Sequence, residues 1–308
     1  MPDLPPADAA LLRLLQALRE RGYAFVTPTP ETHGRNLARR VGDKATSLRD
    51  VFGWSLPFDE SFEPELVALL RDAELIENTP DGPRSAVRVS TLGGRLFLHS
   101  AYPTEAEDAV FFGPDSYRFA HLITDELQGA CPERIVDVGA GSGVGALVAA
   151  GLCPDAEIVM TDVNPRALRL AHVNAAFAGV EATFLQGDGV QPVEGAFDLA
   201  LLNPPYIQDD EERQYRHGGA LHGGQLSIDL AEAICARLSP GGRLILYTGS
   251  AIVDGRDQLR KALETRLPDC ALRYREIDPD VFGEELDRDA YADVERIAVV
   301  AAVLTRSR

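Results

Sequence analysis

The segment RIVDVGAGSG, residues 134–143, joins an apolar run to a turn that contains three glycines. The run is typical of a buried strand, and Gly139, Gly141 and Gly143 follow it at alternate positions. Glycine adopts backbone conformations that other residues avoid, and it lets a ligand approach the main chain closely. Because a helical pattern follows at once, over residues 143–152, this segment predicts the first strand, turn and helix of an α/β ligand-binding fold.

Strand and helix patterns continue to alternate on both sides of this segment. Strands are predicted at 134–139, 157–163, 182–188, 197–205, 242–249, 272–277 and 296–305, and helices at 143–152, 165–179, 225–238 and 253–267. Near-continuous apolar strands that alternate with helices indicate a parallel sheet covered on both faces. No long helix separates the last two strands, so we expect them to pair antiparallel. The prediction is a Rossmann-like sheet of seven strands within residues 110–308.

The first 109 residues have a different pattern. Helices are predicted at 8–22 and 64–76, and the turn signals PDGP and GG within 77–102 predict a small antiparallel ribbon. Helices followed by a hairpin resemble a winged-helix arrangement. The ribbon carries little positive charge, so we expect residues 1–109 to form a smaller α+β domain that recognises or covers a substrate.

Composition narrows the possible partners. The chain of 308 residues has 30 Lys+Arg against 48 Asp+Glu, a formal net charge of -18, which disfavours binding to a polyanion such as nucleic acid. No apolar run reaches membrane-spanning length, and the N-terminus lacks the pattern of a signal peptide, so we expect a cytoplasmic protein. The four cysteines form no CxxC pair, and no metal site is predicted.

Acidic residues stand at the ends of three successive strands. Asp137, two residues before the first glycine, would repel a pyrophosphate and suits a ligand cation such as the amino group of methionine. Asp162 ends the next strand, where a carboxylate can accept from both hydroxyls of a ribose. Asp188 follows the third strand and can accept from the amino group of adenine. Any one of them could instead cap a helix or form a turn, but the three together predict a nucleoside-containing cofactor.

The fourth strand ends in LLNPPY, residues 201–206. Proline cannot donate to a sheet ladder, so the strand must stop there in a rigid turn. The side-chain oxygen of Asn203 and the carbonyl of Pro204 can converge on a planar NH2 group, and Tyr206 offers a flat face for stacking. The turn is therefore predicted to hold an amide or amine.

The segments VDVGAGSG, TDVNPRAL, GDG and LLNPPY together resemble a class I S-adenosylmethionine-dependent methyltransferase. Within that superfamily the similarity is to the HemK-like, or "methyltransferase small", group with its N-P-P-Y motif, which includes the glutamine methyltransferases of peptide-chain release factors. It covers roughly residues 110–308. Where the release-factor members carry a P-R-P-D-T-E-like run, this chain reads GPDSYRF, residues 113–119, which disfavours the release-factor substrate.

The resemblance implies S-adenosylmethionine as cofactor and assigns three groups of residues. The implied cofactor-binding residues are Asp137, Gly139, Ala140, Gly141, Gly143, Asp162, Val163, Asp188, Gly189 and Asn203. The implied catalytic residues are Asn203, Pro204 and Tyr206. In the family, the segment before the first strand covers the cofactor and receives substrate, and the loop here resembles the family's loop after N-P-P-Y, where a histidine near the acceptor could accept the leaving proton. The implied substrate-binding residues are Phe112, Tyr117, Pro205, Tyr206 and His217. Core packing is an equally good or better reading of Phe112 and Tyr117.

The implied activity is methyl transfer to a nitrogen of a protein glutamine, a peptide or a small-molecule acceptor. Two alternatives use the same cofactor: methylation of an RNA base, and a reaction without methyl transfer such as intramolecular cyclisation, because the motifs report the cofactor and not the fate of its carbons. An NAD-linked dehydrogenase is disfavoured by Asp137 and the N-P-P-Y turn, and a non-catalytic binding module by the intact Asn203.

Overall fold

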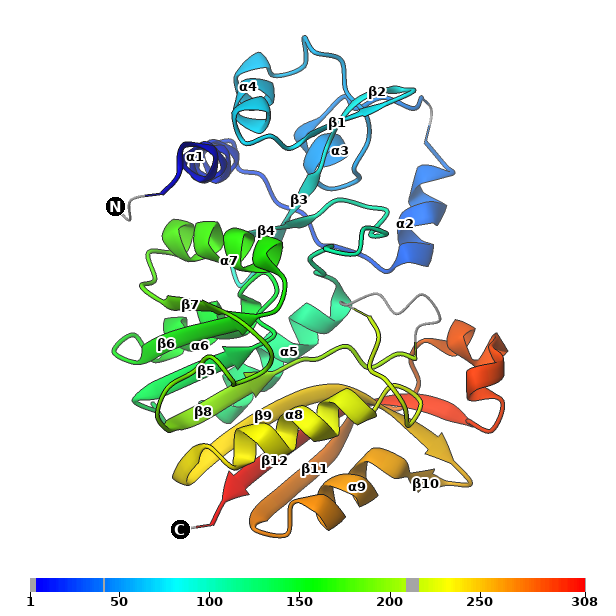
Figure 1. Cartoon of the computed structure of the whole chain (residues 1–308). Helices are drawn as coiled ribbons and strands as arrows, with labels where there is room; N and C mark the ends of the chain where they lie inside the picture. The colour runs from blue at the N-terminus through cyan, green and yellow to red at the C-terminus, as the bar shows by residue number, and fades with distance from the viewer. Residues whose placement is uncertain (1–3, 41, 209–215, 308) are drawn as a thin grey trace. The chain divides into compact units, whose positions relative to one another are not determined.

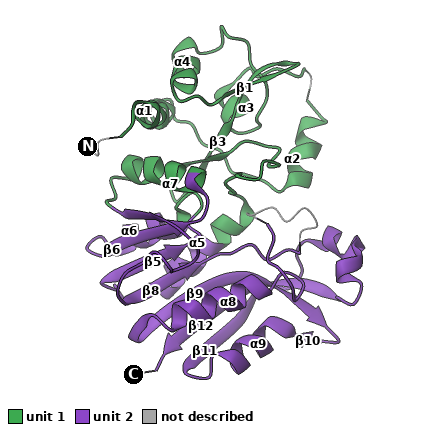
Figure 2. Cartoon of the chain, in the orientation of Figure 1, with its two compact units in different colours: residues 1–118, 141–144, 166–181 green, residues 119–140, 145–165, 182–308 purple. Residues whose placement is uncertain are grey.

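The computed structural model describes residues 4–40, 42–208 and 216–307. The chain divides into two compact units, which Figure 2 shows in different colours. Unit 1 comprises residues 1–118, 141–144 and 166–181, and unit 2 comprises residues 119–140, 145–165 and 182–308. Unit 1 is therefore discontinuous in sequence, because it includes part of the glycine turn and a helix from the second half of the chain.

Unit 1 contains helices and two separate hairpins. Its elements are α1 (Pro6–Glu20), α2 (Pro30–Leu37), α3 (Leu48–Phe52), α4 (Pro64–Asp72), β1 (Ile76–Thr79), β2 (Gly82–Ser85), β3 (Val87–Leu92) and β4 (Arg95–Ser100), with α7 (Pro165–Ala178) from the later sequence. Strand β1 pairs with β2 and β3 with β4, both antiparallel. The predicted helix 64–76 ends earlier, at Asp72, and two hairpins replace the single predicted ribbon.

Two short helices of unit 1 were not predicted, although each has a local start signal. Helix α2 begins with Pro30 after Thr29, whose side chain accepts from the backbone N–H of Thr32. Helix α3 begins with a capping box formed by Ser47 and Asp50. Both helices are too short to give a clear hydrophobic period, so only the caps could have revealed them.

Helix α7 shares the hydrophobic core of unit 1. Its Ala167, Leu170 and Val173 belong to the same buried cluster as residues of α1, α4 and β3. Arg169 Nε also donates to Asp8 Oδ1 of α1 at 2.6 Å. The apolar face that the sequence assigned to a sheet-covering helix is therefore buried against N-terminal elements.

Unit 2 is built on one mixed sheet, seen in Figure 1. Its strands are β5 (Arg134–Val138), β6 (Glu157–Asp162), β7 (Thr183–Gln186), β8 (Phe197–Leu202), β9 (Leu238–Val253), β11 (Cys270–Asp278) and β12 (Arg296–Arg306), in the order β11-β12-β9-β8-β5-β6-β7, and the short β10 (Arg256–Asp257) pairs with β9. Strands β5 to β9 run parallel, whereas β12 is antiparallel to β9 and β11. All seven predicted strands, the antiparallel pairing of the last two and the Rossmann-like α/β fold are confirmed.

Helices α5 (Pro114–Glu126), α6 (Val144–Leu152), α8 (Gln225–Cys235) and α9 (Gln258–Arg266) complete the regular structure, with two short 3₁₀ turns at Gly283–Asp287 and Asp289–Tyr291. Figure 1 shows α8 and α9 on the same face of the sheet. Helix α9 begins later than predicted because Val253 still belongs to β9, and a turn at 254–255 and β10 follow it. Asp257 then caps the helix by accepting from Arg260 N. Over the ranges that the structure describes, no helix is long and apolar enough to cross a membrane.

Candidate active site

The ends of three neighbouring strands in unit 2 form one row. Val138 of β5 pairs with Thr161 of β6 and with Leu202 of β8. The next residues along these strands are Gly139, Asp162 and Asn203, so they line the same carboxyl edge. Neighbouring strands are about 4.8 Å apart, which puts the main chains of Asp162 and Asn203 roughly 10 Å from each other. This edge is where open α/β sheets bind their ligands.

The glycine turn needs glycine for its backbone conformation. Gly139, Gly141 and Gly143 have φ values of +64°, +55° and +80°, which lie in the left-handed region. A Cβ atom at Gly139 or Gly141 would meet no atom within 4 Å, so the space beside the turn is open. Ala140 N donates to Thr161 O at 2.9 Å and ties the turn to β6.

Asp137 lies beneath this turn and is only 2% exposed. Its Oδ2 accepts from Ala146 N at 2.7 Å, near the start of α6. Gly145 makes this contact possible, because a Cβ there would lie 2.8 Å from Asp137 Oδ2. Burial raises the pKa of Asp137 to about 7; the hydrogen bond from Ala146 N opposes this rise, and the charge of Asp162 adds to it. A cation beside Asp137 would favour its ionised form.

The predicted ribose and adenine residues lie on β6 and after β7. Asp162 is buried, and its Oδ1 accepts from Asn164 N at 2.9 Å. The following residue, Val163, is 47% exposed. Asp188 is exposed beside Gly189, which has a φ of +54°. These residues offer one oriented carboxylate, an apolar surface and an accessible acid.

The N-P-P-Y turn is held by close packing. The ring of Tyr206 is 8% exposed and meets Phe282 edge-on, with ring centroids 5.8 Å apart. A Cβ at Gly249 of β9 would lie 2.3 Å from Tyr206 Cδ2, so this glycine leaves room for the ring. Pro204 is buried, whereas Asn203 is half-buried. The ring of Tyr206 therefore anchors the turn that presents Asn203.

The loop after the turn packs backbone to backbone against it. Gly218 N donates to Ile207 O at 2.8 Å, and His217 pairs with Ile207 as an isolated bridge. A Cβ at Gly218 would lie 2.8 Å from Pro205 O, and one at Gly223 would lie 2.3 Å from Tyr206 O. Gly218 and Gly223 of the loop thus permit close approach to the turn.

Phe112 and Tyr117 belong to unit 1. Phe112 is buried and stacks on His99, with centroids 4.8 Å apart, while Tyr117 meets it edge-on at 5.4 Å. The Tyr117 hydroxyl accepts from Thr27 N at 3.1 Å. Both predicted substrate-binding aromatics therefore lie among buried polar and aromatic side chains of the β3–β4 hairpin.

The sequence did not reveal the role of Asn174 in α7, which is 1% exposed. Its Oδ1 accepts from Leu98 N at 2.8 Å, and its Nδ2 donates to Leu98 O at 3.0 Å and to Ser142 O at 2.9 Å. Asn174 thus ties the glycine turn to β4 within unit 1. The available signal was an amide on the apolar face of a helix, where a polar side chain must find buried partners.

Comparison with known proteins agrees with this geometry. Residues 109–263 match the family model "Methyltransferase small domain". A release factor glutamine methyltransferase from Agrobacterium fabrum is 32% identical over 269 residues, which cover 82% of this chain and 87% of that protein.

Two further relatives align over shorter stretches. The release factor glutamine methyltransferase of Deinococcus radiodurans is 34% identical over 182 residues, 56% of this chain and 63% of that protein. Ribosomal RNA small subunit methyltransferase B of Salmonella paratyphi B is 31% identical over 152 residues, 46% of this chain and 35% of that protein. These two matches span less than two thirds of each relative's length. The family match extends over half of the chain, and the chain belongs to the methyltransferase small domain family.

Proposed function

We propose that this protein transfers a methyl group from S-adenosylmethionine to a nitrogen of an amide or amine acceptor. The observation that carries the proposal is the shared row of Gly139, Asp162 and Asn203 at one edge of the sheet. It brings a residue suited to a ribose and a residue suited to an NH2 group to neighbouring strand ends, as a transfer between two ligands requires.

The residues at this edge fit the cofactor. The turn has open space at Gly139 and Gly141, and Ser142 Oγ is buried without a hydrogen-bond partner among the described residues. Asp162 uses Oδ1 to accept from Asn164 N, which orients the carboxylate beside the turn. We assign the ribose hydroxyls to Asp162 and the ligand's amino group to the neighbourhood of Asp137.

When bound, the cofactor would supply a methyl group on a sulfonium: the acceptor nitrogen would take the methyl, the sulfur would leave as the neutral thioether of S-adenosylhomocysteine, and the nitrogen would then lose a proton to solvent. The chain has to hold that nitrogen. Asn203 Oδ1 and Pro204 O are acceptors on one rigid turn, and both can take a hydrogen of the same NH2 group. They also favour the positive charge that develops on the nitrogen during transfer. Tyr206, fixed against Gly249 and Phe282, keeps the turn in place.

A protein glutamine is the first acceptor to test, because the Agrobacterium and Deinococcus relatives bear that name. The chain differs from the release-factor pattern at residues 113–119, so a peptide or small-molecule amide remains within the proposal. We assign acceptor recognition to the N-terminal region. Methylation of an RNA base is the second candidate, supported by the ribosomal RNA methyltransferase relative and disfavoured by the net charge of -18.

The test follows labelled methyl groups from S-adenosylmethionine into glutamine peptides and into fractionated lysate. Asn203→Ala should slow transfer by roughly 10²–10³, because losing one positioned polar contact typically removes about 2.7–4 kcal/mol of transition-state stabilisation. Its affinity for S-adenosylhomocysteine should stay close to that of the wild type. Gln128→Ala, which removes an exposed side-chain amide in the turn after α5, is the matched control and should leave the rate unchanged. A wild-type rate for Asn203→Ala would exclude the amide-holding role.

Cofactor binding has its own test. Asp162→Ala should weaken binding of S-adenosylhomocysteine by about 1–3 kcal/mol, the usual loss for hydrogen bonds to a charged group. Calorimetry with S-adenosylhomocysteine and with NAD measures it. Tighter binding of NAD than of S-adenosylhomocysteine by the wild type would contradict the assigned cofactor.

A further inference from the structure

The β3–β4 hairpin of unit 1 has two buried faces of opposite character. Val87 and Val89 point into the apolar core of the unit, as alternation along a strand predicts. The other face carries Arg88, Ser90 and His99, and Arg88 lies directly opposite His99 in the hairpin register. All three are buried, with Arg88 only 4% exposed. A fully buried arginine normally has an acidic partner.

Arg88 has no such partner among the residues that the structure describes. Its Nε donates to Gly53 O at 2.9 Å, and its guanidinium carbon lies 5.5 Å from the centroid of the Phe25 ring. Within the same ranges, the buried Nη2 makes no hydrogen bond, and no aspartate or glutamate forms an ion pair with Arg88 within 4.0 Å. The chain nevertheless has 48 acidic residues.

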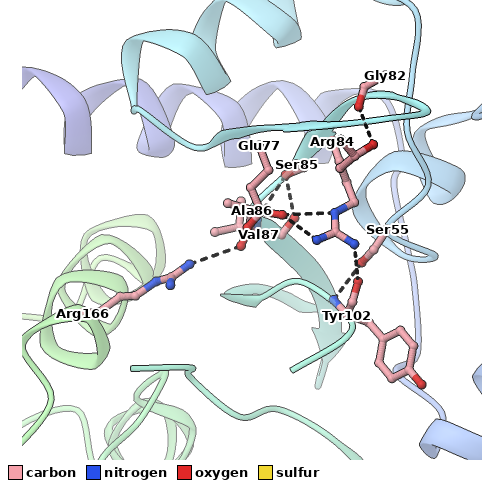
Figure 3. A network of polar contacts seen from close by, with 10 residues as sticks. Ser55, Glu77, Gly82, Arg84, Ser85, Ala86, Val87, Tyr102 and Arg166 are labelled. Carbon is pink, nitrogen blue, oxygen red and sulfur yellow. Dashed lines mark hydrogen bonds and ion pairs between the residues drawn. The ribbon is translucent and has the colours of Figure 1, made fainter. Parts of the chain in front are cut away.

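Arg84, four residues earlier, shows the ordinary arrangement (Figure 3). Its Nε and Nη2 donate to Glu77 Oε2 at 3.1 and 2.6 Å, and its Nη1 donates to Tyr102 O at 3.2 Å. Arg84 is partly exposed, so its pairing with Glu77 is the less demanding case. Of these two arginines, the partly exposed Arg84 thus has a carboxylate partner, whereas the buried Arg88 has none among the described residues.

His33 on α2 adds a second polar group of this kind. It is 1% exposed, and its ring centroid lies 4.1 Å from that of Tyr102. Among the described residues, no group meets the geometry of a hydrogen bond to either ring nitrogen, although the Trp54 backbone lies near enough to raise the pKa of the ring slightly. Burial lowers the pKa of His33 to about 4, and the positive charge of Arg88 contributes to the shift. The imidazole is therefore neutral at physiological pH and can donate one N–H without adding charge.

We propose that Arg88 binds an oxyanion, a carboxylate or a phosphate group, with the N–H of His33 as a second donor. An uncompensated buried cation is strongly unfavourable, and an oxyanion is the partner that a guanidinium fork fits best. Tyr117, which the family resemblance implied to bind substrate, is tied to the same face of the hairpin: its hydroxyl accepts from Thr27 N, and Thr27 Oγ1 is hydrogen-bonded to Ser90 Oγ. Nη2 is shielded, so the covering side chains must move for the anion to reach it.

Thermal unfolding of the full chain tests the site, with inorganic phosphate or acetate against chloride at equal ionic strength. Either oxyanion should raise the Tm of the wild type by more than it raises that of Arg88→Met, because an excluded anion such as phosphate also stabilises proteins without binding to a site. The larger excess identifies phosphate or carboxylate as the preferred group. Without oxyanion, Arg88→Met should raise the Tm by a few degrees, because it removes an unpaired buried charge. It should also reduce the response to both oxyanions to the general effect of the salt. Arg84→Met is the control: it should lower the Tm and keep the response.

A Tm of Arg88→Met below that of the wild type would show that Arg88 is a structural cation and would overturn the proposal. An equal response of the wild type and Arg88→Met would overturn it as well. The Arg88→Lys variant provides a second measurement, because it keeps the positive charge and loses the forked donors of the guanidinium group. A rise in Tm with oxyanion as large as that of the wild type would contradict binding by a guanidinium. Calorimetry with S-adenosylhomocysteine distinguishes the proposed function from the oxyanion site. If the wild type does not bind S-adenosylhomocysteine, the assigned cofactor is wrong, whereas the proposal for Arg88 is unaffected.

Discussion

Replacing Asp137 by asparagine should remove a pH dependence from the stability of the protein. The pKa of Asp137 is about 7 in the folded state, whereas the pKa of an aspartate in an unfolded chain is about 3.9. The folded state therefore binds this proton more tightly. The stabilising contribution of the protonated group is complete below about pH 4 and is lost as the pH rises through about 7.

The size of the effect follows from the two values. A difference of about three pKa units corresponds to roughly 4 kcal/mol between the acid and alkaline limits, and about 2.5 kcal/mol of this falls between pH 5 and pH 8. The amide of the Asp137→Asn variant cannot ionise and keeps an oxygen that can accept from Ala146 N. Urea unfolding at pH 5 and pH 8 measures the free energy of unfolding of both proteins. From pH 5 to pH 8, the free energy of unfolding of the wild type should fall by about 2.5 kcal/mol relative to that of Asp137→Asn.

A second variant isolates the cause. Asp162→Asn removes the neighbouring negative charge that contributes to the raised pKa of Asp137, so the wild-type pH dependence should become smaller. If the difference in stability between the wild type and Asp137→Asn were the same at pH 5 and pH 8, the account of a buried, proton-binding Asp137 would be wrong. Binding of S-adenosylhomocysteine at pH 7 should also release up to about half a proton, seen as a buffer-dependent heat in calorimetry, because the ligand's ammonium favours the carboxylate.

Two further changes test the packing around the site. Gly249→Ala should lower the free energy of unfolding by about 1–3 kcal/mol and slow methyl transfer, because the new Cβ would lie 2.3 Å from Tyr206 Cδ2; unchanged urea unfolding would contradict this packing. Asn174→Leu should weaken binding of S-adenosylhomocysteine by about 1 kcal/mol, since it releases Ser142 O of the glycine turn. Arg169→Gln is its control, on the same helix but bonded to Asp8, and equal ligand affinity in these two variants would exclude the positioning role of Asn174.

The sequence alone determined the seven long strands of unit 2, although not β10, and which residues are candidates for the site. Apolar runs, glycines and prolines act locally, so the ends of β5 and β8 were readable from neighbouring residues. Parallel strands bring their carboxyl ends to one edge, so Asp162 and Asn203 could be placed together without coordinates. The caps at Thr29 and Ser47 were readable by the same local logic, although the helices that they start were not predicted.

Tertiary structure alone decided what these segments pack against. Asn174 and Leu98 are 76 residues apart and Arg169 and Asp8 are 161 apart, so no local pattern could assign α7 to unit 1. The contacts of Arg88 likewise come from residues remote in sequence, such as Gly53 and Phe25, so the sequence around Arg88 could not show that it lacks an acidic partner among the described residues. A sequence carries backbone preference and periodicity in adjacent residues, whereas partners of buried polar groups are fixed only when remote segments pack together.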